Sequence, residues 1–254
     1  MSFHPVRLLM LCLAASLALT AADVAPIEVL NRGIGGNSTR DGLSRYARDV
    51  EQAAPDHLIL YFGMNDALNS AKLVPVADFR ANLQQMIDRA RALKVKTIVL
   101  VTPNPIVATY VKQRHPKHPG EDLAAWLAQY DVAIRELAKE NGLPLADLHA
   151  RFLALAPDLE GKDSLVRNLA NSKAADGVHP TAAGYRVLAE LVAETLSTAV
   201  QPGERVVCFG DSITFGASVP GAGTTTGGTY PAWLSLLLNR QVGIATGDRP
   251  PAPK

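Results

Sequence analysis

Short apolar runs that alternate with segments of helical period constrain the fold of this chain most strongly. Runs rich in β-branched residues and without a helical period are typical of strands buried on both faces. They stand at 27–30, 57–62, 97–101 and 205–209, with a weaker run at 143–148. Amphipathic periods fill intervals such as 76–93 and 121–141. The alternation predicts an α/β fold whose parallel sheet is covered by helices on both faces.

Composition and charge exclude several classes of protein. The chain has 254 residues, of which 48% are hydrophobic and 19% charged, so it can bury a sizeable core and is not a disordered protein. Its formal net charge is +1, and no long basic or acidic run occurs. The charge therefore gives no support for binding to nucleic acid or to an anionic membrane.

The first residues have the features of an export signal. Arg7 precedes an apolar run at 8–19, and small residues follow up to Ala22. The run is shorter than the roughly twenty residues that a membrane span needs. We predict a signal peptide over 1–22, cleaved after Ala22, and a secreted or periplasmic protein without a membrane span. One domain is predicted over 23–243, and the Pro-rich tail 244–254 is predicted to be disordered.

No residue pattern indicates a cofactor or a metal. The chain has two cysteines, Cys12 in the signal and Cys208 inside a strand run, which leaves no disulfide and no cysteine metal site. His115 and His118 lie in a Pro- and Lys-containing loop and are too weak a pair for a metal. A dinucleotide fingerprint fails because Ser38 stands where its last glycine is needed. We predict neither a cofactor nor a metal.

Four polar blocks stand where strands end or helices begin. They are Gly35-Gly36-Asn37-Ser38, Gly63-Met64-Asn65-Asp66, Asp176-Gly177-Val178-His179-Pro180 and Gly210-Asp211-Ser212-Ile213. Open α/β sheets bind ligands at the carboxyl ends of their strands, so these blocks are expected at one edge. Asp176 and His179 share a tight turn, close enough for the carboxylate to accept a hydrogen bond from the imidazole Nδ1–H.

Together the four blocks resemble the SGNH hydrolases, also called GDSL esterases/lipases, over essentially the whole chain after the signal. The resemblance implies a three-layer α/β/α, flavodoxin-like fold with a five-stranded parallel sheet. Its strand order in an unpermuted chain is 2-1-3-4-5. The α/β-hydrolase fold is disfavoured, because Thr214 stands where a G-x-S-x-G elbow around Ser212 requires glycine.

The resemblance also implies the roles of the site residues. Ser212 is expected to be the nucleophile, His179 its general base and Asp176 the carboxylate that orients the base. The oxyanion hole is expected from the backbone N–H groups of Ser212 and Gly36 and from the Asn65 side-chain amide. These residue types suit the chemistry, because a serine hydroxyl needs a base and a tetrahedral oxyanion needs preorganised donors.

One feature departs from the family, which is the order of the blocks. The serine block normally comes first, whereas here it comes last, so the chain is predicted to be circularly permuted. The helix after His179 leads to the face where the strand at Arg205 begins. A helix at 230–240 returns to the same face, where Ile27 begins. The joint and the ends are then expected away from the chemistry, where permutation is tolerated.

We therefore predict an exported serine esterase that hydrolyses small O-acyl esters, favouring acetyl groups on carbohydrate. The Gly/Thr-rich loop 218–229 and the absence of an apolar lid-like segment favour a small acyl group over a long lipid chain. Two alternatives remain open. One is a lysophospholipase- or thioesterase-like acyl hydrolase, and the other is a non-catalytic carbohydrate-binding module.

Overall fold

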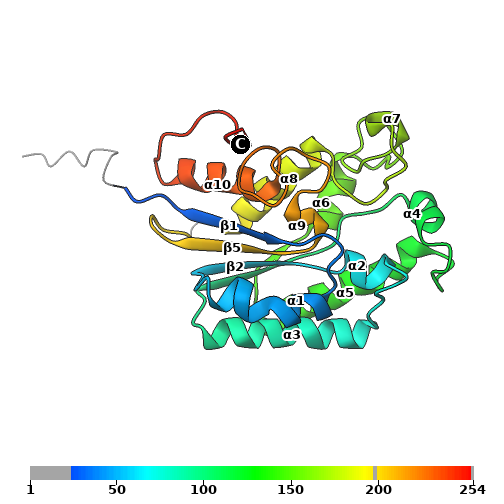
Figure 1. Ribbon diagram of the computed structural model, residues 1–254, viewed down its shortest axis with the longest axis horizontal. Helices are drawn as coiled ribbons and strands as arrows, with labels where there is room; N and C mark the ends of the chain where they lie inside the picture. Colours follow the sequence, from blue (N-terminus) through cyan, green and yellow to red (C-terminus); the bar gives the residue numbers. More distant parts are fainter. Residues whose placement is uncertain (1–23, 197–198, 253–254) are drawn as a thin grey trace, which may run out of the picture.

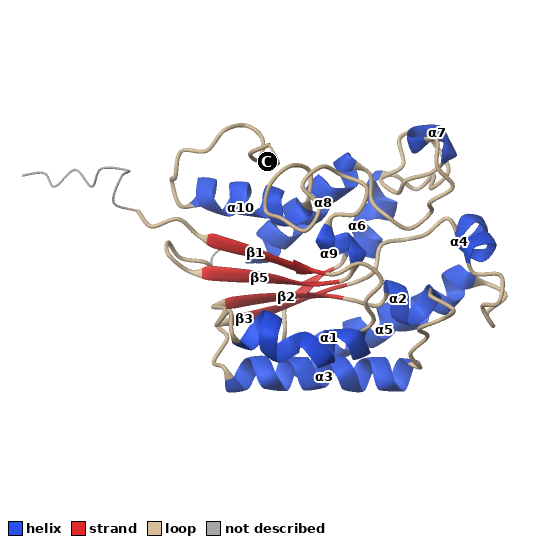
Figure 2. Ribbon diagram, in the orientation of Figure 1, coloured by secondary structure: helices blue, strands red, loops and turns tan. Residues whose placement is uncertain are grey.

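A five-stranded parallel sheet forms the centre of the molecule (Figure 2). The computed structural model describes residues 24–196 and 199–252, so the predicted signal peptide lies outside the described residues. The strands are β1 (Glu28–Gly33), β2 (His57–Tyr61), β3 (Thr97–Val101), β4 (Leu145–Ala146) and β5 (Arg205–Gly210). Their order in the sheet is β1-β5-β2-β3-β4. The last strand in sequence therefore lies between the first and the second, which is the predicted order.

Helices cover both faces of this sheet and complete the predicted three layers. Figure 1 shows α1, α3 and α5 below the sheet, and α6, α8, α9 and α10 above it. The longer helices are α1 (Thr39–Tyr46), α3 (Val76–Ala92), α5 (Leu123–Asn141), α6 (Leu148–Leu155), α8 (Ala182–Leu196) and α10 (Tyr230–Gln241). Shorter ones are α2 (Met64–Leu68), α4 (Ala108–Arg114), α7 (Leu169–Ser172) and α9 (Ser212–Phe215), and a π-helical turn (Ala47–Glu51) continues α1.

The strands in the middle of the sheet are buried from both sides. Every residue of β2 is buried, as are the last five residues of β5. Val206, Val207 and Phe209 are fully buried, and each such side chain contributes about 1.5–3 kcal/mol relative to exposure. Phe209 meets Tyr46 of α1 and Phe62, directly after β2, edge to face, which ties β5 to the helix below and to the neighbouring strand. The continuous apolar runs in the sequence therefore correspond to strands with no solvent face.

Two predicted helices match the structure closely. The predicted apolar face of α3 is buried: Phe79, Leu83, Met86, Ile87 and Ala90. Helix α5 is capped by Asp122, whose carboxylate accepts from two backbone N–H groups, and it ends at Gly142 in the left-handed conformation.

Two boundaries differ from the sequence expectation. Strand β1 runs on to Gly33, beyond the predicted run 27–30, because its pairing with β5 continues until Gly33 lies opposite Gly210. Helix α4 ends directly before His115, in the region whose proline and lysine content predicts a loop. Only Val111 of that helix is buried, so it carries no amphipathic period that a sequence pattern could reveal.

At the amino ends of the strands, hydrogen bonds join segments that are far apart in sequence. The Asn239 side chain at the end of α10 bonds both backbone groups of Ile27, at 2.9 and 3.1 Å. Gly203, in the connection before β5, donates to the carbonyl of Ala25 at 2.9 Å. The described part of the C-terminal tail returns toward the loop after α9, where Gly227 donates to the carbonyl of Pro251 at 2.7 Å.

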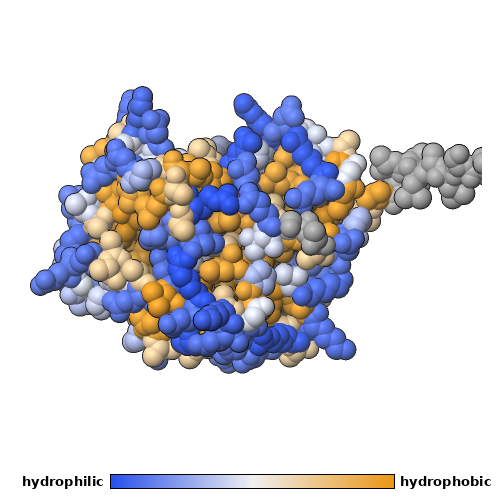
Figure 3. All heavy atoms as spheres, turned by 180° about the vertical axis from the view of Figure 1, so that it is seen from behind, coloured by the Kyte–Doolittle hydropathy of each residue, from blue (hydrophilic) through white to orange (hydrophobic). Residues whose placement is uncertain are grey.

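The surface carries apolar groups in separate patches. Figure 3 shows the rear face, where hydrophobic side chains are interrupted by hydrophilic ones. Among residues 24–196 and 199–252, no helix has both the length and the apolar character that a membrane crossing requires.

Candidate active site

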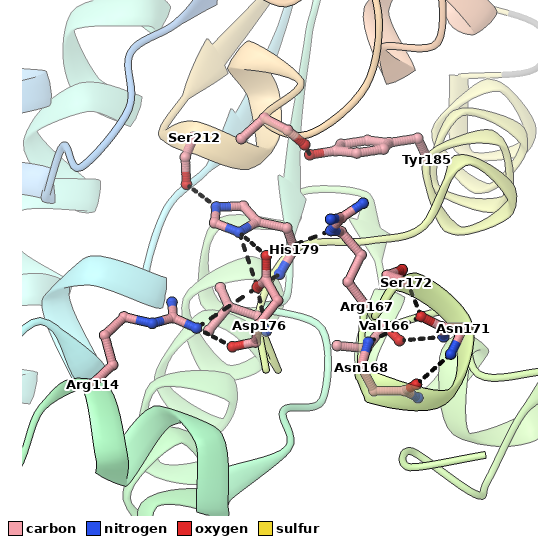
Figure 4. A network of polar contacts seen from close by, with 12 residues as sticks. Arg114, Val166, Arg167, Asn168, Asn171, Ser172, Asp176, His179, Tyr185 and Ser212 are labelled. Atoms are coloured by element: carbon pink, nitrogen blue, oxygen red, sulfur yellow. Dashed lines mark hydrogen bonds and ion pairs between the residues drawn. The ribbon is translucent and has the colours of Figure 1, made fainter. Parts of the chain in front are cut away.

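A serine, a histidine and an aspartate form a chain of hydrogen bonds at the carboxyl edge of the sheet (Figure 4). Ser212 is the first residue of α9, directly after β5, and its Oγ lies 3.0 Å from Nε2 of His179. The Nδ1 atom of His179 lies 3.0 Å from each carboxylate oxygen of Asp176. His179 is 19% exposed and Asp176 13%, so a ligand can reach the histidine while the carboxylate is largely sheltered. The sequence-predicted triad residues are thus brought together.

The turn from β5 into α9 explains why glycine and aspartate precede the serine. A Cβ at Gly210 would lie only 2.2 Å from Oγ1 of Thr214 and 2.4 Å from the carbonyl of Tyr61. Only glycine allows α9 to fold back so closely on the strand end. The Asp211 carboxylate then caps α9 by accepting from the backbone N–H of Ile213 at 2.9 Å. The turn therefore places Ser212 just beyond the carboxyl end of β5.

Two of the three predicted oxyanion donors have free N–H groups. Gly36 has a φ of +74°, and a Cβ there would meet nothing within 4 Å, so its conformation and not its packing requires glycine. Within the described part of the chain, no oxygen accepts from the backbone N–H of Gly36 or of Ser212. Both groups are therefore available to a ligand.

The third predicted donor already has acceptors. The Asn65 amide nitrogen, in the first turn of α2, lies 3.1 Å from the carbonyl of Asn37 and 3.3 Å from Oδ2 of Asp211. These contacts hold the amide between the loop 35–38 and the turn 210–212, called the serine turn below. An oxyanion bound there would replace the longer contact, the one to Asp211.

Buried polar side chains fix the blocks relative to one another. The Asp66 carboxylate is fully buried and accepts from both the backbone N–H and the hydroxyl of Thr39, at the start of α1. Asn104 accepts from the Tyr61 hydroxyl at 2.9 Å and donates to the carbonyl of Val178 at 3.0 Å. Val178 lies in the turn from Asp176 to His179, called the catalytic turn below because it carries the candidate catalytic pair. The ends of β2 and β3 are thereby connected to the turn that carries the histidine.

The carboxylates of the site differ in their electrostatic environments. Burial alone would raise the pKa of Asp176, but hydrogen bonds from the His179 side chain and from the backbone N–H groups of His179 and Val178 outweigh it. The pKa of Asp176 is therefore held well below its usual range, which keeps the group ionised. Burial raises the pKa of Asp211 to about 7, and that of Asp66 to about 6. Ionising either of these two costs free energy.

The raised pKa of Asp211 predicts a dependence of stability on pH. The folded state binds this proton more tightly than the unfolded chain, whose aspartate pKa is about 3.9. The free-energy cost of ionising Asp211 in the folded state is absent below about pH 4. It grows as the pH rises to about 7, where it is on the order of a few kcal/mol. In Asp211→Asn, the loss of unfolding free energy from about pH 5 to about pH 8 should be smaller by about 2 kcal/mol.

Urea unfolding at the two pH values measures this difference. The Asp211→Asn variant retains a side-chain oxygen that can cap α9, so the helix start is preserved. The matched control is Asp78→Asn, because the Asp78 carboxylate is 55% exposed and pairs with Arg40 on the surface. A loss of stability as steep in Asp211→Asn as in the wild type would contradict the assignment.

Two arginines lie next to the triad without having been expected as site residues. Arg114, at the end of α4, donates to the backbone carbonyl of Asp176. Arg167 lies on the other side, with Nε 3.6 Å from Oδ2 of Asp176. Arg114 directly precedes His115, and its sequence context indicates only the Pro- and Lys-containing loop expected there. For Arg167 the sequence contains no signal, because the contact depends on how a loop folds back on the catalytic turn.

A cavity of about 660 Å³ is bounded by Thr109 and Lys112 of α4 and by the start of α5. Across the described ranges, no group of three or more histidine, cysteine or acidic side chains is arranged to hold a metal ion.

Comparison with known proteins identifies the family. The model of the GDSL-like lipase/acylhydrolase family matches residues 12–187, a segment that contains Gly36, Asn65, Asp176 and His179 and ends before Ser212. The chain belongs to this family, and it is a carboxylic ester hydrolase of the SGNH type.

Individual relatives are similar at a moderate level. An uncharacterized lipoprotein of Bacillus subtilis, YqeF, is 30% identical over 68% of this chain and 74% of its own. An acetylxylan esterase of Geobacillus stearothermophilus is 27% identical over 64% of this chain and 69% of its own. The crystal structure of a lipase/acylhydrolase from Enterococcus faecalis is similar with a TM-score of 0.52 and 26% identity, covering 66% of this chain and 75% of that one.

Proposed function

We propose that this protein is an exported serine esterase that removes small acyl groups, in particular acetyl, from carbohydrate. The observation that carries the proposal is the unbroken chain of contacts Ser212–His179–Asp176, with 3.0 Å at each step. A hydroxyl bonded to an imidazole, which is bonded in turn to a carboxylate, is the arrangement that acyl transfer through a serine requires.

In the first half of the proposed reaction, Ser212 Oγ attacks the ester carbonyl while His179 Nε2 takes the hydroxyl proton. Asp176 holds Nδ1–H toward itself, which fixes the tautomer that leaves Nε2 free to accept, and its charge stabilises the imidazolium. The alcohol leaves with the proton from Nε2, and an acyl-serine remains. Water then attacks the acyl group, again with His179 as the base, and the carboxylic acid is released.

The oxyanion of each tetrahedral intermediate would be bound by the free N–H groups of Ser212 and Gly36. The Asn65 amide would donate as a third group, by giving up its 3.3 Å contact with Asp211. That exchange is favoured because the raised pKa of Asp211, about 7, leaves much of this carboxyl group protonated near neutral pH and a weak acceptor. Each preorganised donor is worth about a hundred- to thousandfold in rate.

The choice of substrate rests on the relatives and on the composition of the loops. The Geobacillus stearothermophilus relative is named an acetylxylan esterase. The loop after α9 is rich in glycine and threonine and contains no large apolar side chain that could cover a long acyl chain. A small acyl group on a sugar polymer also suits an enzyme acting outside the cell, which the predicted signal at 1–22 implies.

We further propose that the chain is a circular permutation of the family's usual order. Supporting this, β5 lies between β1 and β2, although it comes last in sequence. The end of α10 is bonded through Asn239 to Ile27, where an unpermuted chain would continue directly into β1. The family match over 12–187 stops before the serine block, as expected when that block is displaced.

The length of the acyl chain distinguishes the proposed activity from its alternative. We expect the mature protein to hydrolyse p-nitrophenyl acetate with a kcat/KM at least about tenfold above that for the octanoate, because the open loop offers a long chain little apolar contact. Rates with both esters, and acetate release from acetylated xylo-oligosaccharides, measure this. A clear preference for octanoate would indicate a lipase- or thioesterase-like enzyme, and no rate above buffer would indicate a non-catalytic module.

A further inference from the structure

Two cations from different parts of the fold face the single carboxylate of the catalytic turn (Figure 4). The guanidinium of Arg114, on α4, donates to the backbone carbonyl of Asp176 and lies 3.8 Å from its Oδ1. The Nε of Arg167, on the segment before α7, lies 3.6 Å from Oδ2. The carboxylate is thus enclosed by an arginine on each side as well as by the histidine.

The segment that carries Arg167 is bonded to the catalytic turn through its backbone as well. Arg167 N–H donates to the carbonyl of His179 at 2.9 Å, and its own carbonyl accepts from Gly177 at 2.9 Å. Asn168, fully buried, and Asn171 hold this segment by bonding the carbonyls of the surrounding loop at 2.8–3.2 Å. Arg167 is therefore fixed relative to the triad.

The hydrogen bonds of the carboxylate leave one position open, and it faces Arg167. Oδ1 accepts from the backbone N–H groups of Val178 and His179, and both oxygens face Nδ1 of His179. Oδ2 has no backbone donor among the described residues. The buried Nε of Arg167 has no hydrogen-bond partner within the described ranges either. At 3.6 Å the contact is an ion pair, and a shift of about half an ångström would make it a hydrogen bond.

We propose that Arg114 and Arg167 are positioning residues that clamp the Asp176 turn and hold its carboxylate in the plane that the His179 imidazole needs. This inference rests on the proposed esterase function. A carboxylate free to rotate would present Nδ1 with a changing acceptor, and the imidazole would lose the orientation that aims Nε2 at Ser212. Misplacement of a reacting group by about 1 Å can cost about a hundredfold in rate.

The clamp also has an electrostatic consequence for the working pH. The charged or titratable groups around the Asp176–His179 pair are Arg114 from α4, Arg167 from the loop before α7, Asp211 from the serine turn and Tyr185 from α8. Both arginines repel a protonated imidazole. Removing one arginine takes away part of this repulsion, so the acidic limb of the rate profile should move up by about half a pH unit.

The experiment compares Arg167→Met, Arg167→Lys and Arg114→Gln with the wild type, using p-nitrophenyl acetate from about pH 5 to about pH 9. In Arg167→Met we expect kcat about tenfold lower and KM changed by less than about twofold, since the arginine orients the base and does not bind substrate. Arg167→Lys, which keeps the charge, should restore part of the rate and the original acidic limb. Arg114→Gln should move the acidic limb as Arg167→Met does.

The matched control is Arg186→Gln, an exposed arginine of α8 that pairs with Glu190 and does not contact the triad. It should leave kcat and the pH profile unchanged. Arg167→Met with wild-type kcat and an unshifted acidic limb overturns the proposal. If circular dichroism shows that Arg167→Met does not fold, kcat and the acidic limb are measured in Arg114→Gln and Arg167→Lys instead, and they test the proposal in the same way.

A measurement independent of turnover separates this inference from the proposed function. A proton shared between Nδ1 of His179 and Asp176 gives a low-field proton resonance in NMR, which His179→Ala identifies by its loss. The resonance should shift or broaden in Arg167→Met and stay unchanged in Arg186→Gln. If the wild type hydrolyses no ester, the functional proposal fails while the resonance still tests the clamp. An unchanged resonance in Arg167→Met contradicts the clamp itself.

Discussion

Replacing Ser212 by alanine is expected to lower kcat for p-nitrophenyl acetate by about 10⁴-fold or more, and His179→Ala by a similar amount. The reason is geometric, because Oγ and Nε2 lie 3.0 Å apart and act as one unit, so that losing either removes the activated nucleophile. Ser212 is only partly buried, so thermal unfolding of its alanine variant should resemble that of the wild type.

The two variants should also be non-additive, with the double variant no slower than the worse single one. Ser44→Ala is the matched control, since the exposed hydroxyl of Ser44 on α1 donates to the carbonyl of Asp41 at 2.7 Å and to no other group among the described residues. Ester hydrolysis by Ser212→Ala at more than about a hundredth of the wild-type rate would mean that another group is the nucleophile.

The second large effect is expected at Asp176. Asp176→Asn should lower kcat by about a thousandfold or more, because an amide facing Nδ1 can present its NH₂ group and stabilise the wrong tautomer of His179. In that tautomer Nε2 carries the proton and cannot accept one from Ser212. The substitution conserves shape, and its remaining oxygen can still accept from the backbone N–H groups of Val178 and His179, so the turn should persist.

Stopped assays of kcat and KM across pH measure this effect, with Asp122→Asn as the control. Asp122 is the exposed cap of α5, where asparagine caps equally well, so its variant should behave as the wild type. A rate for Asp176→Asn within about tenfold of the wild type would mean that groups other than the Asp176 carboxylate orient the imidazole.

The strands and the four polar blocks could be predicted because their signals are local. A run such as 205–209 is apolar at nearly every position, which few structures other than a doubly buried strand allow. The Asp176–His179 contact could be predicted for the same reason, since both residues lie in one turn of the chain. The approach of Ser212 to His179 was inferred from the family resemblance, and the structure has the two side chains in contact.

Features that depend on long-range packing could not be predicted. Helix α4 follows Pro105 and buries only Val111, so neither capping nor periodicity marks it. Arg167 lies beside Asp176 because the loop before α7 folds back along the catalytic turn, with Val166 opposite Pro180. The contacts of the Asn65 amide with Asn37 and Asp211 likewise could not be predicted, because they depend on how β5 and α1 pack against each other.

The place of β5 in the sheet affects how the chain can fold as it is made. Strand β1 lies at the edge and pairs only with β5, and Glu28 and Arg205 are 177 residues apart. During synthesis β1 therefore has no neighbour until residues 205–210 have emerged, and β2 has one side open for the same time. Such distant pairing slows folding. In the exported protein that we propose, this delay would keep the sheet open until after the amino-terminal end has entered the export route.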